Sequence, residues 1–212
     1  NHTIRKIVIS TGLVTTLAGS PGSTGSTNGT GSAARFHYPR GIITDGTNLY
    51  VSDHNNHTIR KIVISSGAVT TFAGSAGYSG STDGTGTSAR FSYPYGMTTD
   101  GTNIYLTDAN NHTIRKIVIS SKAVTTLAGT GSSGSSEGDG TSASFYNPYA
   151  ISIDGSELYV ADHSNHKIRK LDLRGTVTAD VKLHNLDDDT DVTVSLASSD
   201  TTEGTVTPAT LT

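Results

Sequence analysis

Short apolar runs alternate with polar turns along most of the chain, at the spacing expected of β-strands. The runs are rich in Ile, Val, Thr and Tyr, and Asp-Gly, His-Asn-Asn or Ser-Gly lies between them. This pattern predicts short antiparallel strands joined by tight connections. In residues 41–74 the predicted strands are 41–46, 48–53, 58–64 and 68–74.

The same unit recurs along the chain. The string Asn-His-Thr-Ile-Arg-Lys-Ile-Val-Ile-Ser begins at residues 1, 56 and 111, and a drifted copy begins at 165, so the spacings are 55, 55 and 54 residues. A fixed long period means that one supersecondary unit is copied and stacked. Four antiparallel strands per unit form the blade of a β-propeller, which needs about four to eight blades to close a ring. We therefore predict an all-β fold with an incomplete set of blades: half a blade at 1–19, and further blades at 41–74, 96–129 and 150–174.

Long Gly/Ser loops connect the predicted blades. Each loop carries Asn or an acidic residue before Gly, then Ala-x-Phe, then Pro. We expect the phenylalanines to pin the loops to the blades, with the loop tips in solvent. The acidic residue that precedes Gly in these loops is explained by turn formation, and a calcium site is the alternative. The expected buried anchors are Phe36, Phe91 and Phe145, and the expected exposed residues are Ser81, Thr82 and Gly84.

Several motifs in fixed order carry a resemblance to a known family. Leu-Tyr-Val-Ser-Asp precedes Asn-His-x-Ile-Arg-Lys, and Val-Thr-Thr-Leu-Ala-Gly follows it. Residues 1–173 resemble the NHL-repeat family, in its bacterial long-loop form, and this resemblance implies a β-propeller, usually of about six blades. Residues 175–212 resemble part of a Calx-beta-like or immunoglobulin-like domain, so a short C-terminal β segment is expected there. Residues 1–174 would then form the propeller part.

Composition narrows the classes of partner. The net charge is −3, which argues against a nucleic-acid surface. No stretch approaches 18 apolar residues, so we expect no membrane insertion. Cysteine is absent, which excludes disulfides and thiolate metal sites. The Ser/Thr/Gly/Asn-rich, lysine-poor composition is typical of bacterial surface proteins, so an extracellular or cell-surface location is expected.

Candidate chemistry recurs on every blade, and each motif has two interpretations. The Asp-x-x-Asn-His turns suit either a metal site or simple turn formation, in which Asn takes the left-handed position. The Arg-Lys pairs suit either an anion-binding ring or ion pairs with nearby acids such as Asp53. Tyrosines near the prolines form a fringe that suits contact with sugars or proteins. The candidate binding residues are Tyr38, Tyr93, Tyr95, Tyr149, His57, His112 and His166.

No Ser/His/Asp triad or phosphate-binding loop stands out, and the candidate residues are repeated rather than unique. We predict a non-enzymatic scaffold that binds protein, carbohydrate or copies of itself. Unpaired strand edges at both ends favour assembly into a filament. The alternative is a metal-dependent lyase or hydrolase of the NHL-like propeller group. No cofactor is expected, with calcium as the alternative at one acidic run, which comprises Asp187, Asp188, Asp189 and Asp191.

Overall fold

The computed structural model describes residues 1–174, 178–180 and 195–197. By compactness the chain divides into two units, Asn1–Leu171 and Asp172–Thr212. In the second unit, β16 (Thr178–Asp180) pairs antiparallel with β17 (Ser195–Ala197). The acidic run proposed for calcium lies outside the described residues, as does most of the segment compared with Calx-beta-like domains. The described part contains no helix of the length and apolar character needed to cross a membrane.

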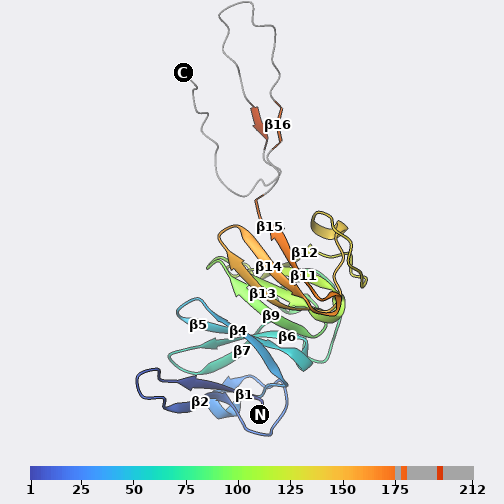
Figure 1. Ribbon diagram of the computed structural model, residues 1–212. Helices are drawn as coiled ribbons and strands as arrows, with labels where there is room; N and C mark the ends of the chain where they lie inside the picture. Colours follow the sequence, from blue (N-terminus) through green and yellow to red (C-terminus); the bar gives the residue numbers. More distant parts are fainter. Residues whose placement is uncertain (175–177, 181–194, 198–212) are drawn as a thin grey trace, which may run out of the picture. The chain divides into compact units, whose positions relative to one another are not determined.

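The first unit is a row of antiparallel sheets that lie side by side (Figure 1). The predicted all-β propeller architecture and the four antiparallel strands of each complete blade are confirmed. The first full blade contains β4 (Pro39–Thr44), β5 (Asn48–Asp53), β6 (Thr58–Val63) and β7 (Ala68–Gly74). The second contains β9 (Pro94–Thr99), β10 (Asn103–Asp108), β11 (Thr113–Val118) and β12 (Ala123–Ala128).

Incomplete sheets flank these two blades in the sequence. The half blade pairs β1 (Thr3–Ile7) with β2 (Val14–Gly19). The third blade has the strand order β13 (Pro148–Asp154), β14 (Glu157–Asp162) and β15 (Lys167–Asp172).

The Gly/Ser loops add a fifth strand that the sequence did not predict. The short strand β3 (Gly29–Thr30) pairs antiparallel with β7, and β8 (Gly84–Thr85) pairs with β12 in the same way. Each of these two loops therefore covers the outer edge of the blade that follows it, and a covered edge is protected from pairing with other chains. Phe36, Phe91 and Phe145 are at most 1% exposed, as expected of loop anchors. Ser81 and Thr82 are exposed, whereas Gly84 is only partly exposed because it pairs with β12.

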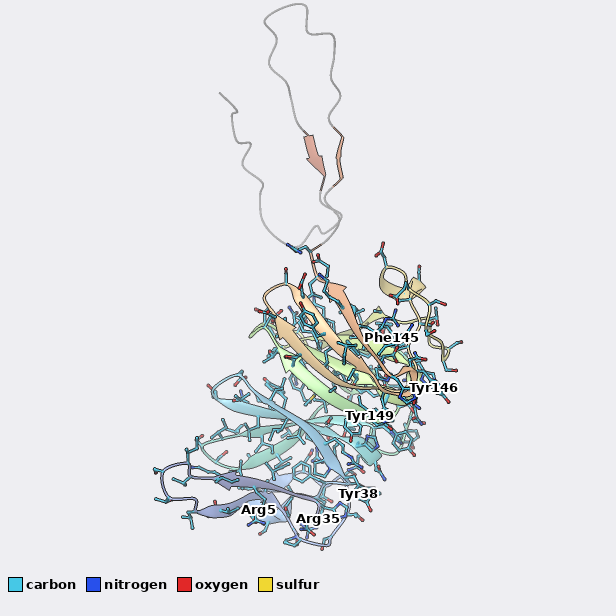
Figure 2. The ribbon with its side chains drawn as sticks, in the orientation of Figure 1. Arg5, Arg35, Tyr38, Phe145, Tyr146 and Tyr149 are labelled. Atoms are coloured by element: carbon cyan, nitrogen blue, oxygen red, sulfur yellow. The ribbon has the colours of Figure 1, made fainter. Side chains whose placement is uncertain are left out.

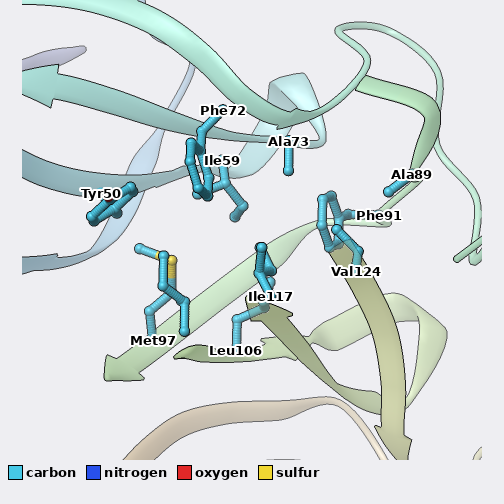
Figure 3. Packing of buried hydrophobic residues seen from close by; sticks show 11 residues of the cluster. Tyr50, Ile59, Phe72, Ala73, Ala89, Phe91, Met97, Leu106, Ile117 and Val124 are labelled. Atoms are coloured by element: carbon cyan, nitrogen blue, oxygen red, sulfur yellow. The ribbon is translucent and has the colours of Figure 1, made fainter. Parts of the chain in front are cut away.

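The hydrophobic core lies between consecutive blades. Tyr50 and Phe72 of the first full blade pack in one cluster with Met97, Leu106 and Ile117 of the second (Figure 3). Apolar residues on both faces of a blade are therefore buried, one face against each neighbouring blade. This explains how a chain with 33% hydrophobic residues builds a continuous core from short strands.

The first strands of neighbouring blades approach each other closely at two glycines. A Cβ atom added to Gly41 would lie 2.4 Å from the carbonyl oxygen of Tyr95, and one added to Gly96 would lie 2.4 Å from that of Tyr149. The hydroxyl of Ser52 donates a hydrogen bond to the Tyr95 carbonyl at 2.6 Å. The absence of a side chain at Gly41 and this hydrogen bond together determine how closely the first strand of the next blade packs.

Candidate functional site

The turn between the second and third strands of each blade has the same unusual geometry. In the first full blade it is a 3₁₀ helix, His54–Asn56, followed by His57 in the left-handed region at φ 58°. His112 and His166 take the same conformation at φ 56°. The expectation that Asn would occupy the left-handed position is therefore wrong. The asparagine side chain is used in another way.

A buried carboxylate organises this turn. Asp53 Oδ2 accepts hydrogen bonds from Arg60 Nη1 at 3.0 Å and from Asn56 Nδ2 at 2.7 Å. Asp53 Oδ1 accepts one from the backbone N–H of His37 at 2.7 Å, which ties the preceding loop to the turn. Asp108 and Asp162 have matching partners on their own blades.

Burial opposes the charged form of Asp108 and Asp53, whereas the paired arginines and the hydrogen-bond donors around them favour it. Loss of solvent raises the pKa of Asp108 to about 6, and the positive charge of Arg115 is the largest of the influences that oppose this rise. Burial also raises the pKa of Asp53, against the hydrogen bonds from Asn56 and from the backbone.

The arginine that pairs with each aspartate also holds the Gly/Ser loop. Arg60 donates to the carbonyl oxygens of Arg35 at 2.9 Å and Thr27 at 3.2 Å, and to Asn28 Oδ1 at 2.9 Å. Its guanidinium carbon lies 5.3 Å from the ring centroid of Phe36, within cation–π range. We call this arrangement the Asp–Arg clamp. It recurs around Arg115 and Arg169, with Asp83 and Glu137 in the place of Asn28 and Phe91 and Phe145 in the place of Phe36.

The Asp–Arg clamp bears on two interpretations left open by the sequence. Arg60 and Arg115 are fully buried and hydrogen-bonded inside the blades, which supports ion pairing over an exposed anion-binding ring. The acid before Gly is bound by this arginine: Asp83 Oδ1 accepts from Arg115 Nη2 at 2.8 Å and from Thr126 Oγ1 at 3.0 Å. Among the described residues, no group of three or more His, Asp or Glu side chains is placed to hold a metal ion.

The histidines join neighbouring blades. The Nδ1 atom of His57 accepts a hydrogen bond from the backbone N–H of Tyr93 at 3.2 Å, and that of His112 accepts one from Asn147 at 3.2 Å. An accepting Nδ1 must be unprotonated, so the ring proton of the neutral form lies on Nε2. Burial lowers the pKa of both histidines, which favours this neutral form. His166 is exposed on the third blade.

The tyrosine candidates gather on the side of the blades where these turns and the loop ends lie. Figure 2 shows Tyr38, Tyr146 and Tyr149 along this side. Tyr38 is 50% exposed, whereas Tyr93, Tyr95 and Tyr149 are partly exposed. Tyr95 and Tyr149 stack with ring centroids 4.5 Å apart and an interplanar angle of 3°.

Two residues that the sequence analysis missed extend this stack. The guanidinium carbon of Arg40 lies 5.3 Å from the centroid of Tyr95, and the ring of His163 stacks on Tyr149 at 4.2 Å. Arg40, Tyr95 and Tyr149 all follow a proline at the start of the first strand of a blade. Comparing these repeat positions would have pointed to Arg40 from the sequence. We call Arg40, Tyr95, Tyr149 and His163 the Arg–Tyr row.

Repeated four-stranded sheets, stacked through apolar faces and held by buried clamps, define the described chain as a series of β-propeller blades. No protein-family model matches the chain. NHL repeat-containing protein 2 of Bos taurus is 33% identical over 184 residues, which cover 80% of this chain and 25% of that protein. The chain belongs to the NHL-repeat β-propeller family, and it spans about a quarter of this relative's length.

Solved structures share the fold. A structural genomics protein of unknown function from Bacteroides thetaiotaomicron superposes with a TM-score of 0.66 and 29% identity, covering 80% of this chain and 42% of that chain. An auxiliary nutrient binding protein from the same organism has a TM-score of 0.63 and 24% identity, again covering 80% and 42%. These similarities extend over most of the chain.

Proposed function

We propose that this chain is a non-enzymatic binding or structural module that acts outside the cell or at the cell surface. Its ligand-binding face is the side that carries the exposed tyrosines. The observation that supports this proposal most strongly is the gathering of aromatic side chains from three consecutive blades on one side. Tyrosine combines apolar area with a hydrogen-bonding hydroxyl and is favoured at such surfaces.

The use of the charged residues supports a non-catalytic role. The same Asp–Arg clamp occurs on three blades, and its carboxylates are committed to arginine and to loop N–H groups. His57 and His112 are committed to the contacts between blades. Catalysis normally depends on a unique constellation with a free base or nucleophile, whereas repeated clamps serve the fold.

The ligand class that we propose is carbohydrate or protein. One structural neighbour is named an auxiliary nutrient binding protein, and a binding role of that kind agrees with the proposal. The alternative of a metal-dependent lyase or hydrolase makes a different prediction. Such an enzyme would retain a stoichiometric metal bound by several histidines, which elemental analysis of the purified protein detects.

A glycan array combined with product analysis tests the proposal. The wild-type chain should retain a ligand, and mass spectrometry should recover that ligand unchanged after prolonged incubation. Tyr95→Ala with Tyr149→Ala should abolish retention, whereas Tyr159→Ala, on the second strand of the third blade, should not. Turnover of the ligand that is lost in a triple variant of His57, His112 and His166 would contradict a non-enzymatic role.

Exposed apolar residues support a second proposal, which is that the chain assembles with further blades. Ile168 on β15 is 73% exposed, whereas its counterparts Ile59 and Ile114 are fully buried against the next blade. Ile7 and Ile9 in the half blade are 62% and 98% exposed. We propose that a copy of the chain covers these faces, as in a filament. Light scattering should show association that Ile168→Ser weakens, and a monodisperse monomer at high concentration would contradict it.

A further inference from the structure

The Arg–Tyr row runs across the innermost strands of three blades. Arg40, Tyr95 and Tyr149 occupy matching positions at the start of β4, β9 and β13, and these strands contact one another in sequence. His163 closes one end of the row, stacked on Tyr149 with an interplanar angle of 18°. A ligand that follows the row would contact consecutive blades at a spacing set by the repeat.

Stacking determines what the row offers to a ligand. Arg40 lies against the ring of Tyr95 at 5.3 Å, and Tyr149 stacks on the same ring at 4.5 Å. Tyr149 is in turn stacked between Tyr95 and His163. Because the ring faces are occupied, the partly exposed tyrosines present their edges and hydroxyl groups. Recognition at this row therefore depends on hydrogen bonds rather than on stacking of a ligand against a ring face.

The hydrogen-bonding capacity of the row is unused. Within the part of the chain that the structure describes, neither the Tyr95 nor the Tyr149 hydroxyl makes a hydrogen bond, whereas Tyr50 donates to Asp45 Oδ2 at 3.0 Å. Arg40 is exposed and has no carboxylate or carbonyl partner among the same residues, unlike the clamped Arg60. A guanidinium carries five N–H donors in a planar fork that matches a carboxylate.

The charges around the row favour an anion. The carboxylates of Asp53, Asp108 and Asp162 on this side are buried and paired with arginine. The exposed or partly exposed ionisable groups beside the row are imidazoles, His54 against Tyr95 and His163 against Tyr149. A surface that carries the guanidinium of Arg40 and spare hydroxyl donors complements a ligand with several oxygen atoms and a negative charge.

We propose that the Arg–Tyr row binds an acidic oligosaccharide, with a sugar carboxylate on Arg40 and sugar hydroxyls on Tyr95 and Tyr149. This inference rests on the proposed function, because it assigns a ligand class to the same face. Arg40 supplies a bidentate, charge-assisted contact, and each tyrosine supplies one neutral hydrogen bond. Arg40 should therefore contribute more to affinity than either tyrosine.

Calorimetric titration of the full 212-residue chain with trigalacturonic acid and its methyl ester tests the inference. The acid should bind at least tenfold more tightly than the ester, and Arg40→Gln should remove that difference. Tyr95→Phe and Tyr149→Phe should each weaken binding several-fold. Lys61→Gln, which removes one positive charge from β6 of the same blade, is the matched control and should leave affinity unchanged.

Three results would overturn the inference, and they differ in what they mean for the proposed function. If a neutral glycan binds in a Tyr149-dependent manner while the acid neither binds nor competes, the acidic ligand is wrong and the binding face remains. If no glycan or protein ligand depends on any residue of the row, both proposals are wrong. Equal losses with Arg40→Gln and Lys61→Gln would show that only general charge attraction operates.

Discussion

The sharpest prediction concerns two carboxylates that bind the same guanidinium. Arg115 donates to Asp108 Oδ2 at 2.8 Å and to Asp83 Oδ1 at 2.8 Å. The Asp108 side chain is fully buried, whereas that of Asp83 is 49% exposed. Replacing either aspartate by asparagine makes the same chemical change at the two ends of one arginine.

The two substitutions should differ strongly in their effect on stability. Asp108→Asn leaves a fully buried guanidinium without its buried counter-ion and weakens the hydrogen bonds from Ser92 and Asn111. Breaking a buried ion pair on one side costs about 3–5 kcal/mol. Asp83→Asn removes a solvent-screened pair worth about 0–1 kcal/mol. The first full blade already has Asn28 at that position, where it accepts from Arg60 at 2.9 Å.

Urea unfolding followed by far-ultraviolet circular dichroism measures both changes in the free energy of unfolding. Hydrogen exchange should also show faster exchange of the loop amides in Asp108→Asn, because Ser92 N–H binds that carboxylate. Equal effects of the two substitutions, or a cost below about 1 kcal/mol for Asp108→Asn, would refute the role assigned to the Asp–Arg clamp.

Three further predictions follow from the packing. Phe91→Ala should lower the free energy of unfolding by about 3–5 kcal/mol, since the ring is fully buried, and unchanged thermal stability would contradict the anchor role. Gly96→Ala should cost about 1–3 kcal/mol in urea unfolding, because its Cβ would lie 2.4 Å from the Tyr149 carbonyl oxygen. The pKa values of His57 and His112 are lowered, so the unfolded state binds more protons at these two sites, and their contribution to stability should fall as the pH drops below about 6.5, opposite in sign to that of Asp108. A His57→Gln, His112→Gln double variant should lose part of that dependence in pH-resolved melts, and an unaltered pH profile would count against the histidine links.

The repeat allowed the strands and the blade architecture to be predicted from the sequence, because apolar alternation and turn residues act locally. The aromatic anchors were also predictable, since Phe36, Phe91 and Phe145 recur at the same position in loops that are otherwise rich in Gly, Ser and Thr. The strands, the blades and the anchors can all be inferred from residues close together in the sequence and from the spacing of the repeat.

Contacts between distant parts of each repeat were harder to predict. The bond from Arg115 to Asp83 joins residues 32 positions apart, and its existence depends on how the loop folds over the blade edge. The left-handed histidines were missed because Asn is the commoner residue in that conformation, and here the Nδ1 contact with the next blade compensates. Predicting the Arg–Tyr row required knowing how the blades lie against one another in space, although the matching positions of Arg40 and Tyr95 are visible in the repeat.

Ligand retention by a Tyr149 variant is the most direct test of the central claim that this propeller binds a ligand through the tyrosine-bearing face. Tyr149→Ala should abolish retention of any ligand that the wild-type chain selects from a glycan array, while the variant still folds, because the Tyr149 backbone carbonyl still accepts a hydrogen bond from Thr107. Full retention by this variant, or conversion of the ligand to product by the wild-type chain, would contradict the account.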